Sequence, residues 1–294
     1  MYDQIAENKR KSVVIMVAFA AFASLIAYFA GLYLGDKSVA PYAVFAALLY
    51  VVFSYYGGSK LALAVNGAKE VTKKDEPRLY RIVENLAITN GMPMPKVYVM
   101  EDKALNAFAT GRDPNHSVVC ATRGLLDVMN DSELQGVMAH EMGHVKNYDI
   151  RVSLLAFALA SVIGLISDFV IRMWFWGGGN SDDDGPASNP IFMAVGVLAI
   201  VLSPIVAALI QAAVSRQREY LADATGAMTT RYPEGLASAL EKIESEGSVL
   251  QKQNTSTAHL FFANPLKGKT LTNLFSTHPP IEDRIKRLRQ MEKA

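Results

Sequence analysis

The stretch His140-Glu-Met-Gly-His144 says most about the fold and chemistry of this sequence. It lies within Asp131–Asp149, which has apolar residues at helical spacing and begins with Ser132-Glu-Leu-Gln135, the pattern of a capping box. On a helix, two histidines at this spacing are neighbours on one face. They can bind one Zn²⁺, and the glutamate between them can reach a metal-bound water. We therefore predict a zinc site on a helix, the alternative being a helix with two surface histidines.

A catalytic zinc needs a third protein ligand and one open position. The sequence has one cysteine, Cys120, so the third ligand must be His, Asp or Glu. The metzincin spacing requires glycine at 147 and histidine at 150, whereas the sequence has Asn147 and Ile150. Glu219 can be the ligand while Asp223, four residues later, accepts the N–H of a zinc-bound histidine. The alternative for this pair is an ordinary solvated face of a helix.

Four blocks of the sequence are apolar and carry few or no charges. Of the 294 residues, 51% are apolar and 19% are charged, whereas soluble domains have about 25% charged residues. The first block is long enough to cross a hydrocarbon core of about 30 Å. The second block follows at once, which favours a membrane hairpin over a cleaved signal peptide. The blocks are Val13–Leu34, Val39–Tyr56, Ser153–Trp176 and Ile191–Ile210.

The third block is the least regular, because it contains Asp168 and Arg172. A buried hairpin of a soluble protein is therefore the alternative for the third and fourth blocks. Basic residues flank all four blocks on one side, whereas the loop Gly177–Pro190 contains three aspartates and no Lys or Arg. The positive-inside rule places the basic side in the cytoplasm, with Arg172 as the one exception.

This pattern predicts the organisation of the whole chain. A helical hairpin formed by the last two blocks would return Glu219 to the depth of His144, which favours the ligand interpretation of Glu219. We expect a cytoplasmic N-terminus at 1–12, a transmembrane hairpin at 13–56, a cytoplasmic domain at 57–152 and 215–294, and a second membrane hairpin at 153–214 with an external loop at 177–190.

The two polar stretches indicate one α+β domain that is mostly helical. Asp75–Asn90 has apolar residues at helical spacing, and Lys96–Met100 alternates like a strand. Leu105–Thr110 and Ser117–Ala121 are separated by turn residues, as in a hairpin. The second stretch is mainly helical and ends in a helix with one apolar face, at Ile281–Leu288.

Taken together, the motifs resemble those of the HtpX-type membrane metalloproteases, which are bacterial relatives of the eukaryotic CAAX-prenyl endopeptidases. The resemblance covers nearly the whole chain, including the two apolar blocks before the motif helix and the two after it. It implies a gluzincin-like zinc protease domain with four transmembrane helices. The matching segments are Asn106–Gly111, His140–His144, Glu219–Asp223, and Ser276–Pro280 with Arg284.

The resemblance also implies roles for individual residues. Glu141 would be the catalytic glutamate, which takes a proton from the attacking water and passes it to the leaving amine. Residues that match His278 and Arg284 are associated with substrate and transition-state contacts, although His278 alone is typical of a helix entry. One Zn²⁺ per chain would be held by His140, His144 and Glu219, and Asp223 would accept the N–H of a zinc-bound histidine.

The segment Leu105–Gly111 has two interpretations. It can be a core strand, or an edge strand on which an extended substrate adds as a further strand. The resemblance favours the edge strand, with Asn106, Ala107 and Phe108 contacting the substrate.

We therefore expect a zinc-dependent endopeptidase in the bacterial inner (cytoplasmic) membrane, with its catalytic domain facing the cytoplasm. As the resemblance implies, its substrates would be misfolded or damaged membrane proteins, and some cytosolic ones, in stress-related quality control. Besides protein substrates, its partner would be the lipid bilayer. The net charge of +1 provides no basic field for nucleic acid.

Two other functions compete with this expectation. An intramembrane protease also uses a histidine pair on a membrane helix, but charged residues at both ends of Asp131–Asp149 argue against burial in lipid. A transporter or scaffold with a structural zinc site would need ionisable residues in several spans, and only Asp168 and Arg172 qualify. His116 and His259 have no partner pattern, so we expect them at the surface.

Overall fold

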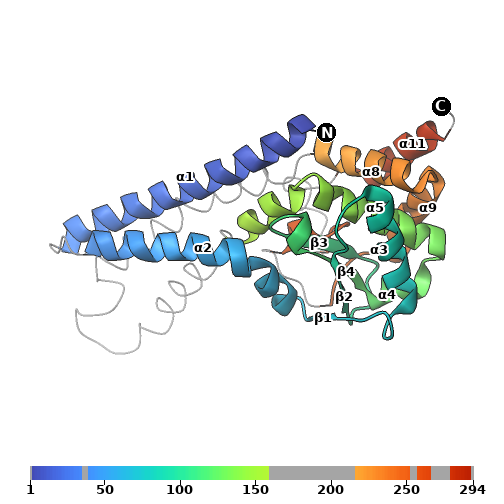
Figure 1. The fold of residues 1–294 in the computed structure, drawn as a ribbon, viewed down its shortest axis with the longest axis horizontal. Helices are drawn as coiled ribbons and strands as arrows, with labels where there is room; N and C mark the ends of the chain where they lie inside the picture. Colours follow the sequence, from blue (N-terminus) through green and yellow to red (C-terminus); the bar gives the residue numbers. More distant parts are fainter. Residues whose placement is uncertain (1, 35–38, 159–215, 252–256, 266–278, 293–294) are drawn as a thin grey trace, which may run out of the picture.

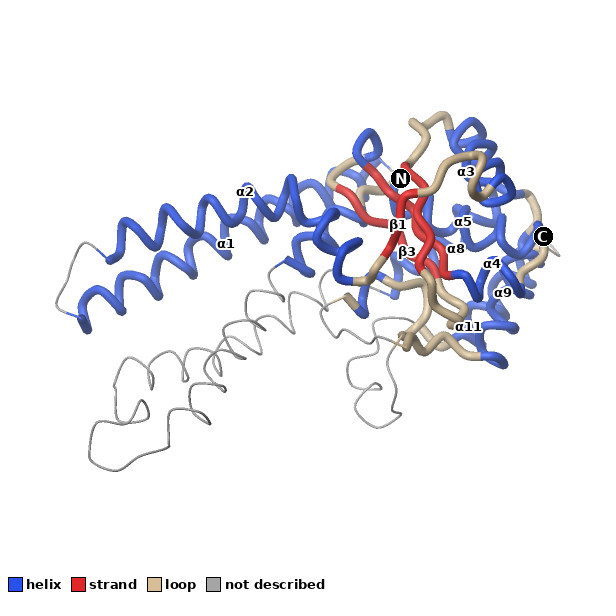
Figure 2. The backbone as a smooth tube through the Cα atoms, turned by 90° about the horizontal axis from the view of Figure 1, so that it is seen from below, coloured by secondary structure: helices blue, strands red, loops and turns tan. Residues whose placement is uncertain are grey.

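Two long helices project from a body that contains the other elements (Figures 1 and 2). The structure, a computed structural model, describes residues 2–34, 39–158, 216–251, 257–265 and 279–292. The projecting pair is α1 (Tyr2–Leu34) and α2 (Val39–Val65), which pack along each other. The third and fourth apolar blocks lie outside the described residues, except for a helical stretch at 149–158 that enters the third.

The surface of this helical hairpin is strongly apolar. Among the side chains that the structure describes, several large apolar ones on both helices are 50% or more exposed, and in a soluble protein such a surface would be covered. Among the described residues, one helical segment, Val44–Val65, has the length and composition of a membrane span. Examples of the exposed side chains are Val13, Val17, Phe45, Leu49, Val52 and Phe53.

Helix α2 runs on to Val65 and passes the predicted end of the second block at Tyr56. It does so because its last turns pack against the body. Gly58 lets α2 approach Leu154, since a Cβ at position 58 would lie 3.0 Å from the Leu154 Cδ1 atom. Ala62 is fully buried in a cluster with Phe108 and Leu154. The end of α2 therefore belongs to the body of the protein.

A four-stranded mixed sheet forms one layer of the body. Its order is β1-β2-β4-β3; β2 and β4 are parallel, and the two outer pairs are antiparallel. The predicted hairpin is confirmed, with Phe108 opposite Cys120, and β3 lies at an edge of the sheet. Neither β1 nor the parallel pairing was predicted. The strands are β1 (Ala68–Glu70), β2 (Lys96–Met100), β3 (Ala107–Gly111) and β4 (Ser117–Thr122).

Helix α5 (Asp131–Lys146) lies at the centre of the body, and eleven of its sixteen residues are buried. It packs against the sheet and against three other helices. The remaining elements are α3 (Pro77–Asn90), α4 (Arg123–Val128), α8 (Arg216–Thr230), α9 (Pro233–Glu246), α11 (Ile281–Met291) and the short 3₁₀ helices η1 (Pro114–His116) and η3 (Ala258–Leu260).

The predicted helices in the polar stretches are confirmed. Helix α3 has Pro77 in its first turn and ends at Gly91, whose φ of 59° is the left-handed conformation that glycine adopts most easily. Helix α11 buries Ile285 and Leu288, as its apolar face predicts. The protein is therefore a mostly helical α+β fold with a small mixed sheet.

The ends of α5 differ from the prediction. Its capping box is formed by Asn130 and Glu133, so the box predicted at Ser132–Gln135 is wrong. The Asn130 side chain accepts from the Glu133 amide, and Glu133 accepts from the Asn130 amide at 2.8 Å. The helix also ends at Lys146 rather than at Asp149, because Tyr148 adopts a positive φ of 62°.

Candidate metal centre

The site is built where α5 and α8 cross closely. Gly143 of α5 lies against α8, and a Cβ there would lie 3.5 Å from the Ala222 Cα atom. Gly226 of α8 lies against α5, and a Cβ there would come within 3.1 Å of the His140 backbone nitrogen. The contact at Gly226 is tighter than a side chain normally allows, and across this close crossing Glu219 faces the histidines of α5.

Three side chains place their ligand atoms around one point. The Nε2 atoms of His140 and His144 are 3.1 Å apart. Glu219 Oε2 lies 3.7 Å from His140 Nε2, and Glu219 Oε1 lies 3.5 Å from His144 Nε2. Ligands at zinc bond lengths of about 2.0–2.1 Å in a tetrahedron are about 3.3 Å apart. The separations therefore fit one tetrahedral metal ion.

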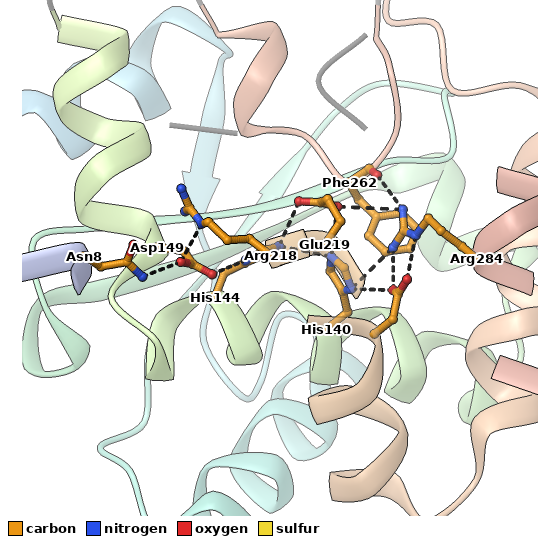
Figure 3. Close-up of polar contacts among 9 residues, drawn as sticks. Asn8, His140, His144, Asp149, Arg218, Glu219, Phe262 and Arg284 are labelled. Atoms are coloured by element: carbon orange, nitrogen blue, oxygen red, sulfur yellow. Dashed lines mark hydrogen bonds and ion pairs between the residues drawn. The ribbon is translucent and has the colours of Figure 1, made fainter. Parts of the chain in front are cut away.

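The second nitrogen of each histidine explains why a cation fits between them. Nδ1 of His140 lies 2.9 Å from Asp223 Oδ1, and Nδ1 of His144 lies 2.9 Å from Asp149 Oδ2 (Figure 3). A carboxylate accepts hydrogen bonds, so each Nδ1 carries a proton, and the Nε2 atom of the neutral His140 is left with a lone pair. The two Nε2 atoms face each other at 3.1 Å, and a metal ion can take the place of the proton that His144 holds between them.

The surroundings of the two histidines shift their pKa values in opposite directions. Burial lowers the pKa of His140 to about 4, which outweighs the opposing effect of Asp223. Burial acts in the same sense on His144, but Asp149 and Glu219 outweigh it and raise the pKa to about 9. A metal ion must displace the proton from His144, so metal binding at this site depends on pH.

Glu141 lies beside this site in a buried setting. Its side chain is 2% exposed, and burial together with the charge of Glu219 raises its pKa to about 7. The backbone amide of Ala109, on the edge strand, acts in the opposite sense. A carboxyl group with a pKa near neutrality is suited to general acid–base chemistry at neutral pH.

Arg284 is 1% exposed and bound to Asp223. Its Nε atom donates to Asp223 Oδ2 at 2.9 Å and its Nη2 atom donates to Oδ1 at 2.7 Å, while its guanidinium lies 4.7 Å from the centre of the Phe262 ring. This placement differs from the substrate contact that the resemblance implied. The guanidinium instead holds Asp223, which in turn orients His140.

Asn106 also differs from the expected substrate contact. It is fully buried, and its amide donates to the backbone carbonyls of Ser248 and Ala263 at 3.1 and 2.8 Å. Its carbonyl oxygen accepts from the Ala263 amide at 3.1 Å. Asn106 therefore fastens the segment around Ala263 to the start of β3.

That segment covers the first part of the β3 edge. The Ala107 carbonyl accepts a hydrogen bond from the Phe262 amide at 2.8 Å, and the buried Phe108 ring packs edge-on against Phe261. Ala109 lines the cleft beside the metal site. Phe108 itself pairs with Phe261 as an antiparallel bridge, so the part of the edge that faces the site begins beyond Phe108.

A cleft of about 430 Å³, which includes space open to solvent, joins the metal site to this edge. His259 lines it, and the expectation that His259 is a surface residue is wrong: it is 5% exposed, with Nε2 3.0 Å from the Ser153 carbonyl. His116 is exposed as expected, beside Asp113. His278 lies outside the described residues.

The sequence analysis missed Asp149 as a partner of His144. Helical spacing gave no signal for it, because a residue five positions after His144 on a continuous helix would lie about 140° around the axis. The left-handed conformation of Tyr148 ends α5 and brings Asp149 back to His144.

Comparison with known proteins agrees with this site. Residues 73–292 match peptidase family M48. A protein named Protease HtpX homolog from Tropheryma whipplei (strain Twist) is 51% identical over 292 residues, covering 99% of this chain and 98% of its own. One of the same name from Ligilactobacillus salivarius is 43% identical over 295 residues, covering 99% and 100%.

A solved structure shows the same fold. The crystal structure of S. mikatae Ste24p superposes with a TM-score of 0.51 at 18% identity, covering 98% of this chain and 67% of that chain. The match to the family over residues 73–292, the identities to the relatives and the His-His-Glu cluster agree with one another. The chain therefore belongs to peptidase family M48 and is a metalloprotease.

Proposed function

We propose that this chain is a zinc-dependent membrane endopeptidase, with the metal held by His140, His144 and Glu219. The observation that supports it most directly is the geometry of the two Nε2 atoms, which face each other and Glu219 at zinc-like separations. When bound, zinc would supply a Lewis acid and lower the pKa of water to about 7. Ligands of His and carboxylate type with one open position are typical of catalytic zinc sites.

Glu141 is the proposed general base. Its raised pKa of about 7 lets it take a proton from the attacking water and return one to the leaving amine at neutral pH. Asp223 holds His140 in the tautomer that leaves Nε2 free, and Arg284 holds Asp223. His278 is proposed to stabilise the oxyanion, on the resemblance alone.

The substrate is proposed to bind as an extended strand along β3. The edge is covered up to Phe108, which pairs with Phe261, and Ala109 lines the cleft next to Glu141. An extended peptide could therefore pair with β3 from Ala109 onward and present its backbone to the site. Asn106 and Phe108 hold the segment around Phe261 and Ala263 against the start of β3 and so set where the open edge begins.

The membrane arrangement is proposed to have four spans. The exposed apolar surface of α1 and α2 supports a first hairpin at 13–56, and the basic flanks in the sequence support a second at 153–214. The peptidase domain, 57–152 and 215–294, would face the cytoplasm, and the loop 177–190 would face outward. Ser153, where the third block begins, lines the same cleft as His144, which supports a site near the bilayer.

The cellular setting follows from this position. A site close to the bacterial cytoplasmic membrane can reach cytosolic loops of membrane proteins and soluble proteins that come to the surface. We therefore propose that misfolded or damaged membrane proteins are the main substrates, in stress-related quality control. The name of the relatives, Protease HtpX homolog, supports the protease activity.

The reaction is tested with the purified full-length protein in detergent. Zinc-loaded protein should cleave an unfolded reporter such as casein, and Glu141→Gln should bind zinc with unchanged stoichiometry and cleave at least about 100-fold more slowly. The matched control is Glu101→Gln, an exposed carboxylate paired with Arg123, which should keep full activity. Cleavage that survives Glu141→Gln would refute the proposed mechanism.

The topology is tested with a cysteine in the proposed external loop. Asp182→Cys should react with a membrane-impermeant thiol reagent added to intact cells, whereas the native Cys120 is buried and should stay unlabelled. Labelling that occurs only after lysis would show that the orientation is reversed.

A further inference from the structure

The first helix of the membrane hairpin contacts the partner of a metal ligand. Asn8 of α1 is 4% exposed, and its side-chain nitrogen lies 2.7 Å from Asp149 Oδ1. The other oxygen of Asp149 lies 2.9 Å from His144 Nδ1. A continuous chain of contacts therefore runs from α1 through Asp149 to His144 (Figure 3).

Asn8 also holds the turn that places Asp149. The same nitrogen donates to the Asn147 carbonyl at 2.8 Å, so its two partners lie on either side of Tyr148. Tyr148 has a φ of 62°, a backbone conformation that residues other than glycine rarely adopt. Lys9 adds a further contact from α1, with its Nζ atom 4.6 Å from the centre of the Tyr148 ring.

Asp149 connects three helices at the site. It is 2% exposed, and its Oδ1 atom lies within 2.7 Å of both Asn8 of α1 and Arg218 of α8. Its Oδ2 atom faces His144 of α5. Because Arg218 precedes Glu219 on α8, the carboxylate of Asp149 links α1 to both helices that supply the ligands.

We propose that Asn8 is a positioning residue of the metal centre. By bonding both sides of the strained turn at Tyr148, it fixes Asp149 where that carboxylate orients His144, so metal affinity depends on the docking of α1. This inference rests on the proposed zinc site. A residue that precedes the first membrane block is thereby part of the support of the metal.

The chemistry of an amide suits this position. The Asn8 nitrogen donates a hydrogen bond to the Asp149 carboxylate and adds no charge. An aspartate at position 8 would have nearly the same size but would place a second carboxylate against Asp149. The two substitutions Asn8→Ala and Asn8→Asp therefore separate the loss of a bond from an added repulsion.

The test measures the zinc affinity of the full-length protein in detergent by competition with a chromophoric chelator. Loss of an outer partner of a metal ligand weakens metal affinity by about 10- to 100-fold. Asn8 is one contact further out, so we expect about a 3- to 10-fold loss for Asn8→Ala and about a 10- to 100-fold loss for Asn8→Asp. The Co²⁺-loaded variants should also show altered ligand-field spectra.

The matched control is Ser12→Ala on the same helix. Ser12 is also buried, and its hydroxyl donates to the Asn8 backbone carbonyl within α1. Thermal unfolding with a chelator present compares the stability of the variants without metal. If both Asn8 variants bind zinc within twofold of Ser12→Ala, the proposal is wrong, whatever happens to stability. If the wild type itself binds no zinc, the proposed function fails instead.

Discussion

The ion pair between Asp223 and Arg284 provides a quantitative test of how the site is supported. Both side chains are at most 3% exposed, and two hydrogen bonds of 2.9 and 2.7 Å join them. Asp223→Ala leaves the Arg284 guanidinium buried without its bidentate partner. Breaking a buried pair in this way costs about 3–5 kcal/mol of unfolding free energy, a large part of the stability of a domain.

The double substitution separates the pair from the metal site. In Asp223→Ala/Arg284→Met both charges are absent, and replacing both partners of a buried pair with apolar groups is often nearly neutral. We therefore expect the double variant to lose less than about 3 kcal/mol, whereas the two single losses add to about 6–10 kcal/mol. Zinc affinity should not recover, because His140 still lacks its Nδ1 acceptor, and it should stay about 10- to 100-fold below the wild type.

The assay combines two measurements on four proteins in detergent: the wild type, Asp223→Ala, Arg284→Met and the double variant. Denaturant unfolding of the metal-free proteins, followed by circular dichroism, gives the stability cycle, and chelator competition gives the zinc affinity. If the losses of unfolding free energy in the two single variants simply add in the double variant, Asp223 and Arg284 do not stabilise the fold as a pair. If zinc affinity recovers together with stability, Asp223 does not act on the metal through His140.

Three further predictions use other contacts. Glu219→Ala should lower zinc occupancy, measured by elemental analysis, more than Asp223→Ala, because it removes a ligand itself; equal losses would argue against ligation by Glu219. Burial alone would raise the pKa of Glu133, but hydrogen bonds from Lys242, the Asn130 amide and Ser238 lower it below 4.5. The charge of Glu133 therefore stabilises the fold above about pH 4.5, and this contribution is lost as the pH falls. Glu133→Gln should therefore be about 1–3 kcal/mol less stable at pH 7 in metal-free unfolding, with a gap that closes toward pH 3; a constant gap would contradict the ionic role. Gly226→Val should push α8 away from the His140 backbone and lower both the melting temperature and zinc affinity; normal zinc binding would show that the close approach is not required.

Local patterns predicted much of the domain. Pro77 and Gly91 marked the ends of α3, and the turn residues between Leu105 and Ser117 marked the β3–β4 hairpin, because these signals act within a few residues. The three-residue strand β1 was missed, since it is stable only through its pairing with β2. The end of α2 was also missed, because its last turns are buried against residues far along the chain, such as Leu154 beside Gly58 and Ala62.

The sequence by itself determined which side chains share a helix face and so could form the metal site. The spacing of His140 and His144 within one helix places both on one face whatever surrounds them, and the spacing of Glu219 and Asp223 does the same on a second helix. Only the tertiary structure decided what supports them. Arg284 behind Asp223, and Asn8 behind Asp149, come from segments far along the chain, and packing and the left-handed turn at Tyr148 bring them together. The periodicity of the sequence does not predict such contacts, because they depend on how the helices pack against one another rather than on the geometry of any single helix.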